Sequence, residues 1–422
     1  MKFVFLPFSA QGHVGPTLPV ARELVSRGHE VVYYVTGAYE QAVRGTGAAF
    51  RKIDDALGLH HVTKDVTGKT GLQMLEEAMP HLFATFRRGL ERAPEMAARV
   101  RTEAADCVVY DVMSTWGRAT ADLLRLPTSS FYTTYVLPES TQSGNEVGSG
   151  GEQPSRPPLK EIIAMLRLRW ASEMLHWRHG VPRRRMPELF VAYEDLNIVC
   201  VPRSFHPDIE HFDERFLFVG PTTVAPRETP TDFPFEQLEG KPVLLVSMGT
   251  TPLNQRPEFY RPCLEAFGGT RWQVVMVVGQ GIDLGSLGPI PSNFILRPYV
   301  PQPEILQKLA RVFITHGGMN SVMEGLWFGV PMLVFPQISE HALSAKRVEA
   351  FGLGRALKED VALNPQALLQ AVEAVDADPS HRTKLAEFQP TLREGGGHRR
   401  AAEALEQYVL RKREPVGQRA AS

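Results

Sequence analysis

Two series of short apolar runs, each alternating with helix-like segments, limit the possible folds of this chain more than any other sequence feature. In the first half, strands are predicted at 2–6, 30–35 and 107–110, and helices near 17–27 and 115–125. In the second half, strands are predicted at 243–247, 273–278, 311–315 and 331–335. Such alternation is typical of parallel sheets covered by helices, with ligands bound beyond the carboxyl ends of the strands.

Two segments interrupt this alternation. Residues 221–234 contain four prolines and no core-forming run, which is typical of a linker between domains. Residues 140–158 are rich in Gly, Ser and Pro, and we expect a loop there. The chain is therefore predicted to contain two α/β domains of similar size.

A basic stretch at 156–185 follows the loop, with eight Lys or Arg and two Glu. Near-helical spacing connects its apolar residues Ile162, Ile163, Leu166, Trp170 and Leu175. The spacing predicts an amphipathic helix, with a solvated polar face as the simplest interpretation. Contact with an acidic partner or a membrane surface, and a role in lining an acceptor site, remain open alternatives.

Composition excludes several classes of protein. With 46 Lys and Arg against 47 Asp and Glu, the chain lacks the basic surplus of a nucleic-acid-binding protein. Three cysteines far apart form no disulfide or zinc framework. The start of the chain is apolar for only about eight residues, too few for a signal peptide. No run of 18 apolar residues occurs, and we expect a cytoplasmic protein without stable membrane insertion.

The most informative residues follow the predicted strand at 311–315. His316 ends this strand, and Gly318 lets a ligand approach the backbone. The N–H groups of Asn320 and Ser321 would open a helix and form an anion site. Glu324 lies one helical turn after Asn320, where a carboxylate suits ribose hydroxyls. Spacing alone leaves open a simple Gly-rich turn followed by an exposed glutamate.

This block resembles the donor-binding signature of the glycosyltransferases that use UDP- or dTDP-activated sugars. The signature combines aromatic-x-Pro-Gln, His-x-Gly-x-Asn-Ser-x-x-Glu, Gly-Val-Pro, a later Pro and an acidic residue before Gln. The matching residues are Tyr299, Pro301, Gln302, His316, Gly318, Asn320, Ser321, Glu324, Gly329, Val330, Pro331, Pro336 and Glu340. Segment 5–31 is similar to the family's opening strand, catalytic loop and first helix. Segments 197–221 and 394–406 are similar to its bacterial macrolide branch, whereas about 140–190 has no recognisable counterpart.

The resemblance implies the GT-B fold, in which two Rossmann-like domains face each other across a cleft. Residues 1–220 would form the acceptor domain, and 221–234 the linker. Residues 235–395 would bind the nucleotide sugar, and a helix at 396–412 would cross back to the first domain.

His13 falls on the family's catalytic base and Asp111 on its partner. An acceptor hydroxyl is a poor nucleophile until a base takes its proton, and imidazole titrates near neutral pH. A carboxylate on the other ring nitrogen would select the tautomer and stabilise the imidazolium. Both residues follow predicted strands, so we expect them at the same edge of the sheet.

The resemblance also implies the donor contacts. Ser247 and Thr250 would reach the β-phosphate, Tyr299 would stack on the base and Gln302 would hold the ribose or the base edge. His341 replaces the usual Gln, which leaves the identity of the sugar open. The full set of expected donor-binding residues is Ser247, Thr250, Tyr299, Val300, Gln302, His316, Gly318, Asn320, Ser321, Glu324, Glu340 and His341.

The implied reaction is inverting, metal-independent transfer of a hexose to a hydroxyl of a small natural-product acceptor. The co-substrate would be a UDP- or dTDP-hexose, with no cofactor, and the protein would be a monomer or homodimer. Asp376-Ala377-Asp378 spells a metal-binding motif of unrelated transferases, but here it follows a helix pattern and is expected to be a helix end. A nucleotide-sugar epimerase and a non-catalytic helper of a partner transferase are the rival functions.

Overall fold

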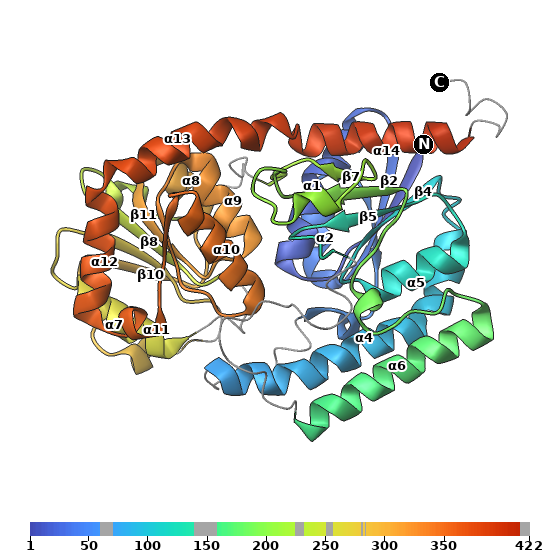
Figure 1. The fold of residues 1–422 in the computed structure, drawn as a ribbon, viewed down its shortest axis with the longest axis horizontal. Helices are drawn as coiled ribbons and strands as arrows, with labels where there is room; N and C mark the ends of the chain where they lie inside the picture. Colours follow the sequence, from blue (N-terminus) through green and yellow to red (C-terminus); the bar gives the residue numbers. More distant parts are fainter. Residues whose placement is uncertain are drawn as a thin grey trace. The chain divides into compact units, whose positions relative to one another are not determined.

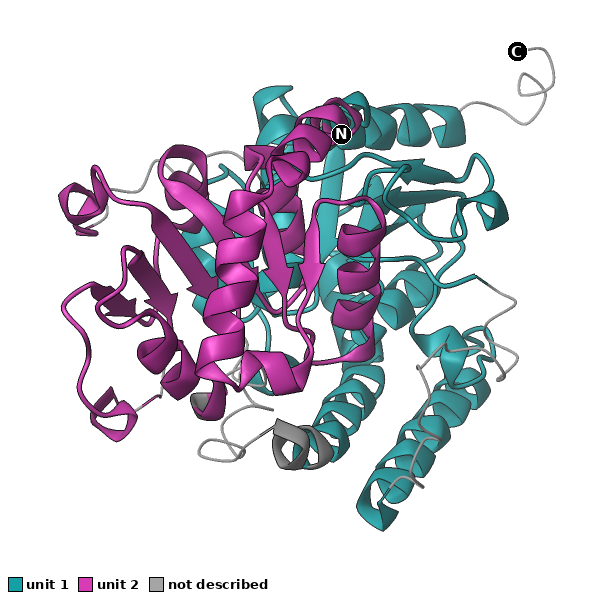
Figure 2. Ribbon diagram, turned by 60° about the vertical axis from the view of Figure 1, so that its left-hand side comes forward, with its two compact units in different colours: residues 1–66, 76–223, 393–422 teal, residues 67–75, 224–392 magenta. Residues whose placement is uncertain are grey.

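A computed structural model of the chain describes residues 1–59, 71–138, 158–223, 232–249, 256–279, 282 and 284–413. The chain divides into two compact units (Figure 2). Unit 1 comprises Met1–Val66, Glu76–Thr223 and Arg393–Ser422, and unit 2 comprises Thr67–Leu75 and Val224–Leu392. Each unit is built on one sheet, with helices on both of its faces (Figure 1).

Unit 1 contains a seven-stranded parallel sheet in the order β3-β2-β1-β4-β5-β6-β7. Its strands are β1 (Lys2–Leu6), β2 (Glu30–Val35), β3 (Ala49–Lys52), β4 (Cys107–Asp111), β5 (Thr128–Tyr132), β6 (Leu196–Val199) and β7 (Phe216–Phe218). The helices wholly or mainly in this unit are α1 (Gln11–Ser26), α2 (Glu40–Arg44), α4 (Gly71–Arg101), α5 (Thr115–Leu124), α6 (Leu159–His179) and α14 (Gly397–Arg413).

Unit 2 contains a six-stranded parallel sheet in the order β10-β9-β8-β11-β12-β13. Its strands are β8 (Val243–Ser247), β9 (Gln273–Val277), β10 (Phe294–Arg297), β11 (Ala310–Thr315), β12 (Met332–Val334) and β13 (Gly354–Ala356). The helices wholly or mainly in this unit are α7 (Pro257–Phe267), α8 (Gln302–Lys308), α9 (Met319–Phe328), α10 (Ser339–Ala350), α11 (Glu359–Ala362), α12 (Pro365–Ala377) and α13 (Pro379–Glu394).

The strand order of both sheets reverses once. In unit 1 the chain moves outward from β1 to β3 and then returns to place β4 beside β1. In unit 2 the same reversal places β11 beside β8. Such a reversal separates the connecting loops at the carboxyl ends of the two central strands and opens a crevice for ligands. Each unit therefore has one preferred place for a ligand.

Helix α1 begins earlier than the sequence predicts. It starts at Gln11 and includes Pro16 and Pro19, although prolines inside a helix remove hydrogen bonds. Burial of Val14 and Leu24 in the core of unit 1 favours the helix despite this loss. His13 consequently lies in the first turn of a helix and not in a loop.

Helix α14 packs on α1, although the two are far apart in sequence (Figure 1). Glu406 accepts hydrogen bonds from Arg27 at 2.6 Å and His29 at 2.5 Å. Buried Leu405 and Val409 join the core of unit 1 on the same side. The C-terminal helix is therefore an integral part of the first unit.

All the strands predicted from apolar runs are present, with ends shifted by at most one residue. The predicted amphipathic helix is α6, but its buried side chains are Leu168, Ala171 and Leu175. Of the five apolar residues that predicted this helix, all except Leu175 are exposed. The predicted loop at 140–158 lies almost wholly outside the described residues, as does the middle of the proline-rich segment.

Candidate active site

The first group of candidate residues lies at the carboxyl end of the sheet of unit 1. His13 is in the first turn of α1, just after β1, and Asp111 is the last residue of β4. His13 Nδ1 lies 2.8 Å from Asp111 Oδ2, although the residues are 98 positions apart. The order β1-β4 places this pair where the strand order reverses.

The surroundings of Asp111 determine which nitrogen of His13 carries a proton. The carboxylate is buried, and its other oxygen accepts a hydrogen bond from the backbone N–H of Met113 at 2.8 Å. Because a carboxylate only accepts, His13 Nδ1 must donate to it. In the neutral ring, Nε2 then bears the lone pair, so Nε2 is the basic atom. The side chain of His13 is 23% exposed.

Two further residues hold His13 and were missed by the sequence analysis. Thr133 Oγ1 lies 3.3 Å from His13 Nδ1, and the ring of Phe8 packs edge-to-face on the imidazole at 5.4 Å. Thr133 directly follows β5, which pairs with β4. Its position directly after a strand could have identified Thr133 as a site residue. However, β5 has the sequence TSSFY, which contains no continuous apolar run and was therefore not predicted as a strand.

The second group lies in unit 2, at the junction of β11 and α9. Helix α9 begins after Gly318, and no side chain caps its N-terminus. The ring of His316 packs directly against the backbone of Gly249 and Gly318. A Cβ atom at these glycines would lie 2.7 Å and 2.3 Å from the ring. Only glycine permits this close approach.

His316 donates a hydrogen bond to the backbone carbonyl of Ser247, the last residue of β8. Its Nδ1 is buried and has no hydrogen-bond partner among the residues that the structure describes. Burial lowers the pKa of His316 to about 4. The ring is therefore neutral near pH 7, with one unpaired buried nitrogen beside the start of α9.

His341 lies against His316 and is almost fully buried. The two rings pack edge-to-face with centroids 4.8 Å apart. The backbone N–H of Gln337 donates to His341 Nδ1 at 3.4 Å, which places the proton of the neutral ring on Nε2. Burial, and to a smaller extent the neighbouring His316, lower the pKa of His341 to about 3. Since the residue is only 6% exposed, its ring packs around His316 and forms little of the surface.

A carboxylate and an amide are joined across α8 and α9. Gln302 Nε2 donates to Glu324 Oε2 at 2.7 Å and lies 3.4 Å from Ser321 Oγ. Tyr299, three residues before Gln302, is 51% exposed. Val300 is buried, and its carbonyl accepts from the backbone N–H of Gln302. A half-exposed aromatic residue thus lies three positions before the amide of this polar pair.

The structure therefore joins most of the expected donor residues into two contact groups of unit 2. One contains Ser247, His316, Gly318 and His341, and the other Gln302, Ser321 and Glu324. Asn320 lies in the first turn of α9, and Glu340 in the first turn of α10. Thr250 lies outside the described residues.

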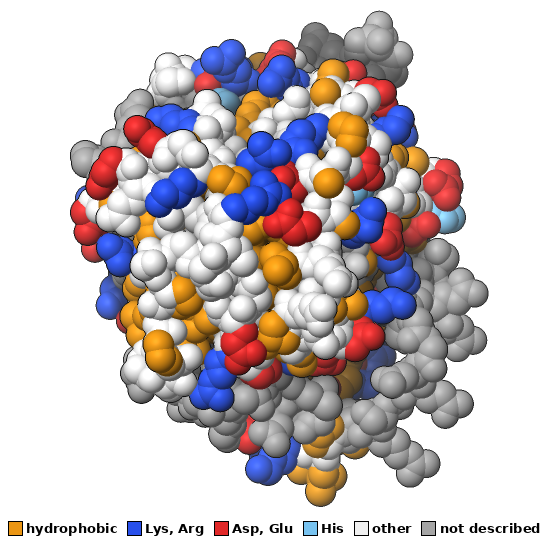
Figure 3. Space-filling view, turned by 90° about the vertical axis from the view of Figure 1, so that its left-hand side faces the viewer, with side chains coloured by type: hydrophobic (Ala, Val, Ile, Leu, Met, Phe, Trp, Pro, Cys, Tyr) orange, Lys and Arg blue, Asp and Glu red, His pale blue; other side chains and the backbone are white. Residues whose placement is uncertain are grey.

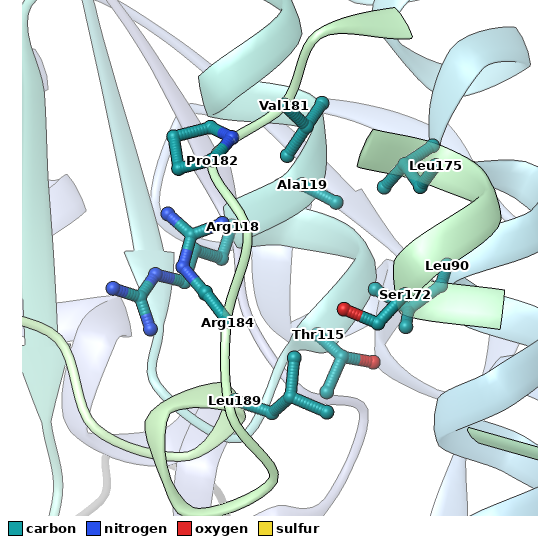
Figure 4. Close-up of a pocket in the computed structure, with 10 residues that line it drawn as sticks. All are labelled: Leu90, Thr115, Arg118, Ala119, Ser172, Leu175, Val181, Pro182, Arg184 and Leu189. Carbon is teal, nitrogen blue, oxygen red and sulfur yellow. The ribbon is translucent and has the colours of Figure 1, made fainter. Parts of the chain in front are cut away.

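A small pocket in unit 1 lies beneath α6 (Figure 4). Leu90, Ser172 and Leu175 line one side, and Arg118 and Arg184 the other. Its volume is about 10 Å³, which is room for a single water molecule. Arg184 is already paired with Asp122 through two hydrogen bonds. The pocket is too small to bind an organic acceptor.

Within the described ranges, no group of three or more His, Cys, Asp or Glu residues is arranged to hold a metal ion. Asp376 lies at the end of α12 and accepts hydrogen bonds from Arg271, Arg311 and Arg382. The first carboxylate of the Asp-Ala-Asp sequence therefore pairs with arginines at the end of a helix. The sequence predicted a helix end at this position.

The two buried histidines of unit 2 should make its stability depend on pH. Their folded pKa values lie below the ordinary value of 6.5, so the unfolded chain binds more protons as the pH falls. Stability is complete above pH 6.5 and declines as the pH falls toward 4. Between pH 7.5 and 5 we expect a loss of roughly 2 kcal/mol for each histidine in the free energy of unfolding.

Urea unfolding of wild type, His316→Gln and His341→Gln at several pH values would measure this loss. Each variant should show a shallower decline, because glutamine does not titrate. His211→Gln, at an exposed histidine of unit 1, is the control and should keep the wild-type slope. Equal slopes in all four proteins would contradict the prediction.

Comparison with known proteins extends over nearly the whole chain. A family model described as the C-terminal domain of erythromycin biosynthesis protein CIII-like proteins matches residues 267–392. The chain is 35% identical over 407 residues to NDP-glycosyltransferase YjiC of Bacillus subtilis (strain 168), covering 96% of this chain and 97% of that protein. It is 28% identical over 418 residues to the oleandomycin glycosyltransferase of Streptomyces antibioticus, covering 97% and 92%.

A solved structure also resembles the whole chain. The calicheamicin glycosyltransferase CalG4 superposes with a TM-score of 0.75 at 30% identity, covering 98% of this chain and 99% of that one. The likeness thus includes both units, and with them the elements that carry His13, Asp111 and His316.

Proposed function

Because this chain belongs to the nucleotide-sugar-dependent glycosyltransferases of the GT-B fold, in the bacterial branch with the macrolide and antibiotic enzymes, we propose that it transfers a hexose to a small acceptor. The family and fold class expected from the sequence are confirmed. The proposal adds the donor, the acceptor class and the mechanism. It rests above all on the 2.8 Å contact between His13 and Asp111 at the reversal point of the sheet.

In the proposed reaction, His13 Nε2 removes the proton from an acceptor hydroxyl. The hydroxyl oxygen attacks the anomeric carbon of the sugar and forms the new glycosidic bond. The bond from that carbon to the diphosphate oxygen breaks on the opposite side, so the anomeric configuration inverts. Asp111 accepts a hydrogen bond from Nδ1 throughout and stabilises the imidazolium that forms.

Unit 2 would bind the nucleotide sugar. The uncapped N-terminus of α9 and the hydroxyl of Ser247 would meet the diphosphate, which a helix dipole also favours. Nδ1 of His316 has no hydrogen-bond partner among the described residues, and we assign it to a diphosphate oxygen. A nitrogen facing an anion must carry a proton, so binding would raise the pKa of this ring. These groups would stabilise the charge on the leaving diphosphate without a metal ion.

The base and ribose would lie nearer α8. The half-exposed ring of Tyr299 supports stacking on a planar base. The carboxylate of Glu324, positioned by Gln302, supports binding of ribose hydroxyls. Glu340 would accept hydrogen bonds from adjacent sugar hydroxyls, which favours a UDP-hexose over a dTDP-deoxysugar.

An assay of several UDP- and dTDP-sugars against a panel of hydroxylated natural products, read by mass spectrometry, tests this function. A mass increase of one hexose in an acceptor, with the inverted anomeric configuration by NMR, is the expected result. Conversion of the sugar nucleotide in the absence of acceptor would instead identify an epimerase. Transfer only after addition of a partner transferase would identify a helper.

Glu324→Ala should weaken donor binding much more than it slows the chemical step. Ribose contacts are made equally in the ground and transition states, so their loss raises KM and leaves kcat nearly unchanged. A charged hydrogen bond contributes about 1.5–3 kcal/mol, and we expect an increase of about 10- to 100-fold in the dissociation constant of UDP. Titration calorimetry would measure it.

Glu349→Ala removes an exposed carboxylate from α10 and is the matched control. It should bind UDP as wild type does. Glu324→Gln keeps the shape of the side chain and would separate loss of charge from loss of packing. Unchanged UDP affinity in both Glu324 variants would exclude the ribose assignment.

A further inference from the structure

Helix α6 presents an apolar stripe to solvent. Of the twelve large hydrophobic residues that are exposed within the described ranges, six lie on this one helix. At about 100° per residue they fall within an arc of about 100° on a helical wheel. They are Leu159, Ile162, Ile163, Leu166, Trp170 and Trp177.

The opposite side of α6 is already part of the core of unit 1. Leu168, Ala171 and Leu175 are buried and join a cluster with Phe86 and Leu90 of α4. Figure 1 shows α6 running beside α4. The helix is thus anchored by one apolar face and exposes a second, more extensive one, with Trp177 79% and Trp170 61% exposed.

Basic side chains border the exposed stripe on both sides. Lys160, Arg167 and Arg178 lie along one margin of the helix, and Arg169 lies along the other. All four are exposed, and within the described part of the chain none of them has an ion-pair partner. By contrast, acidic and basic side chains are interspersed over the face drawn in Figure 3.

Acidic groups on α6 do not offset these charges. Glu173 is the one carboxylate of α6 within the arc of the stripe, and Arg183 pairs with it at 2.9 Å. Glu161 lies on the side of the helix away from the stripe. An apolar stripe with tryptophans and bordering cations has the arrangement of a helix at a membrane interface, where apolar residues enter the acyl region and cations meet phosphate headgroups.

We propose that α6 is a docking surface for an anionic lipid bilayer, on which it lies parallel to the membrane plane. No helix within the described ranges is long and apolar enough to span a membrane, so the contact would be peripheral. Trp170 and Trp177 are seven residues apart on the same face and would enter the interface together. This docking does not depend on the proposed transfer reaction.

Charge favours lipid over a second copy of the chain. In a symmetric dimer through α6, the cations of one copy would face those of the other around an apolar contact. An anionic bilayer instead complements the cations and the apolar stripe at once.

Flotation with extruded vesicles tests this proposal. Wild-type protein should float with vesicles of equal parts phosphatidylcholine and phosphatidylglycerol and stay behind with phosphatidylcholine alone. Binding should weaken as salt rises, because screening reduces attraction between exposed charges.

Two variants separate the apolar and ionic contributions. Trp170→Ser combined with Trp177→Ser should lower vesicle affinity by about tenfold or more. Arg167→Gln combined with Arg178→Gln should lower it by about 25-fold, or about fivefold for each cation. Leu410→Ser and Arg101→Gln, at exposed positions of α14 and α4, are the matched controls and should bind as wild type does. Circular dichroism and transfer activity in solution should be unchanged in all four.

Loss of flotation in both α6 variants, with normal flotation of the controls, would support the proposal. Absence of vesicle binding by the wild type, equal binding to neutral vesicles, or equal losses in the controls would overturn it. A dimer in sedimentation velocity that dissociates in the tryptophan variant, without vesicle binding, would assign the stripe to a second copy instead.

Discussion

Replacing His13 with alanine should lower kcat for sugar transfer by about 10²–10⁴-fold, the usual contribution of a general base. Removal of the imidazole leaves the acceptor hydroxyl with water as its only base. The affinity for UDP should stay close to that of wild type, because the proposed donor residues all belong to unit 2. Transfer rates at saturating donor and acceptor, together with calorimetry for UDP, would measure both effects.

His211→Ala is the matched control, since it removes an exposed histidine from the same unit. It should transfer sugar at the wild-type rate. Turnover by His13→Ala within a few-fold of wild type would contradict the assignment of the base. An equal loss of UDP affinity would place His13 in the donor site instead.

Asp111→Asn should impair turnover by about 10²–10⁴-fold while keeping the shape of the side chain. The backbone N–H of Met113 donates to Oδ1, so the amide oxygen of asparagine is required at that position. The amide nitrogen would then face His13 Nδ1 and donate to it. This arrangement moves the imidazole proton to Nε2, where the lone pair is needed for the acceptor proton.

A double-mutant cycle tests whether the two residues act as a unit. Once His13 is absent, Asp111→Asn should cost little more, because the carboxylate acts only through the imidazole. Thr133→Val removes the hydroxyl 3.3 Å from Nδ1 and should have a much smaller effect. Additive losses in the cycle, or a rise in acceptor KM with unchanged kcat, would identify Asp111 as an acceptor contact.

The sequence predicted the features that depend on local pattern. Continuous apolar runs marked β1, β2, β4, β8 and β9, since strands buried on both faces contain few polar residues. The spacing from His316 to Glu324 predicted a strand, a glycine turn and a helix, and all three are present as β11, Gly318 and α9. Resemblance to a family then pointed to His13 and Asp111 as partners.

Polar or very short strands gave too little local signal. Strand β5 contains Ser129 and Ser130, which are buried, and β13 has only three residues. Thr133 follows β5, so it could not be assigned to the site before that strand was located. Pairing with neighbouring strands stabilises such segments, and this pairing is not encoded in their own composition.

What the sequence determined by itself was the class of fold, most strand positions and the donor signature, because these depend on periodicity and on residues at fixed spacing. Only the tertiary structure decided the strand order that brings His13 to Asp111 and the burial of His341 against His316. It also decided which apolar face of α6 is covered. That helix has apolar residues on both sides, and only packing against α4 buries Leu168 and leaves Trp170 in solvent. The strand order, the burial of His341 and the covered face of α6 all depend on contacts between segments that are distant in sequence. A local sequence pattern does not specify such contacts.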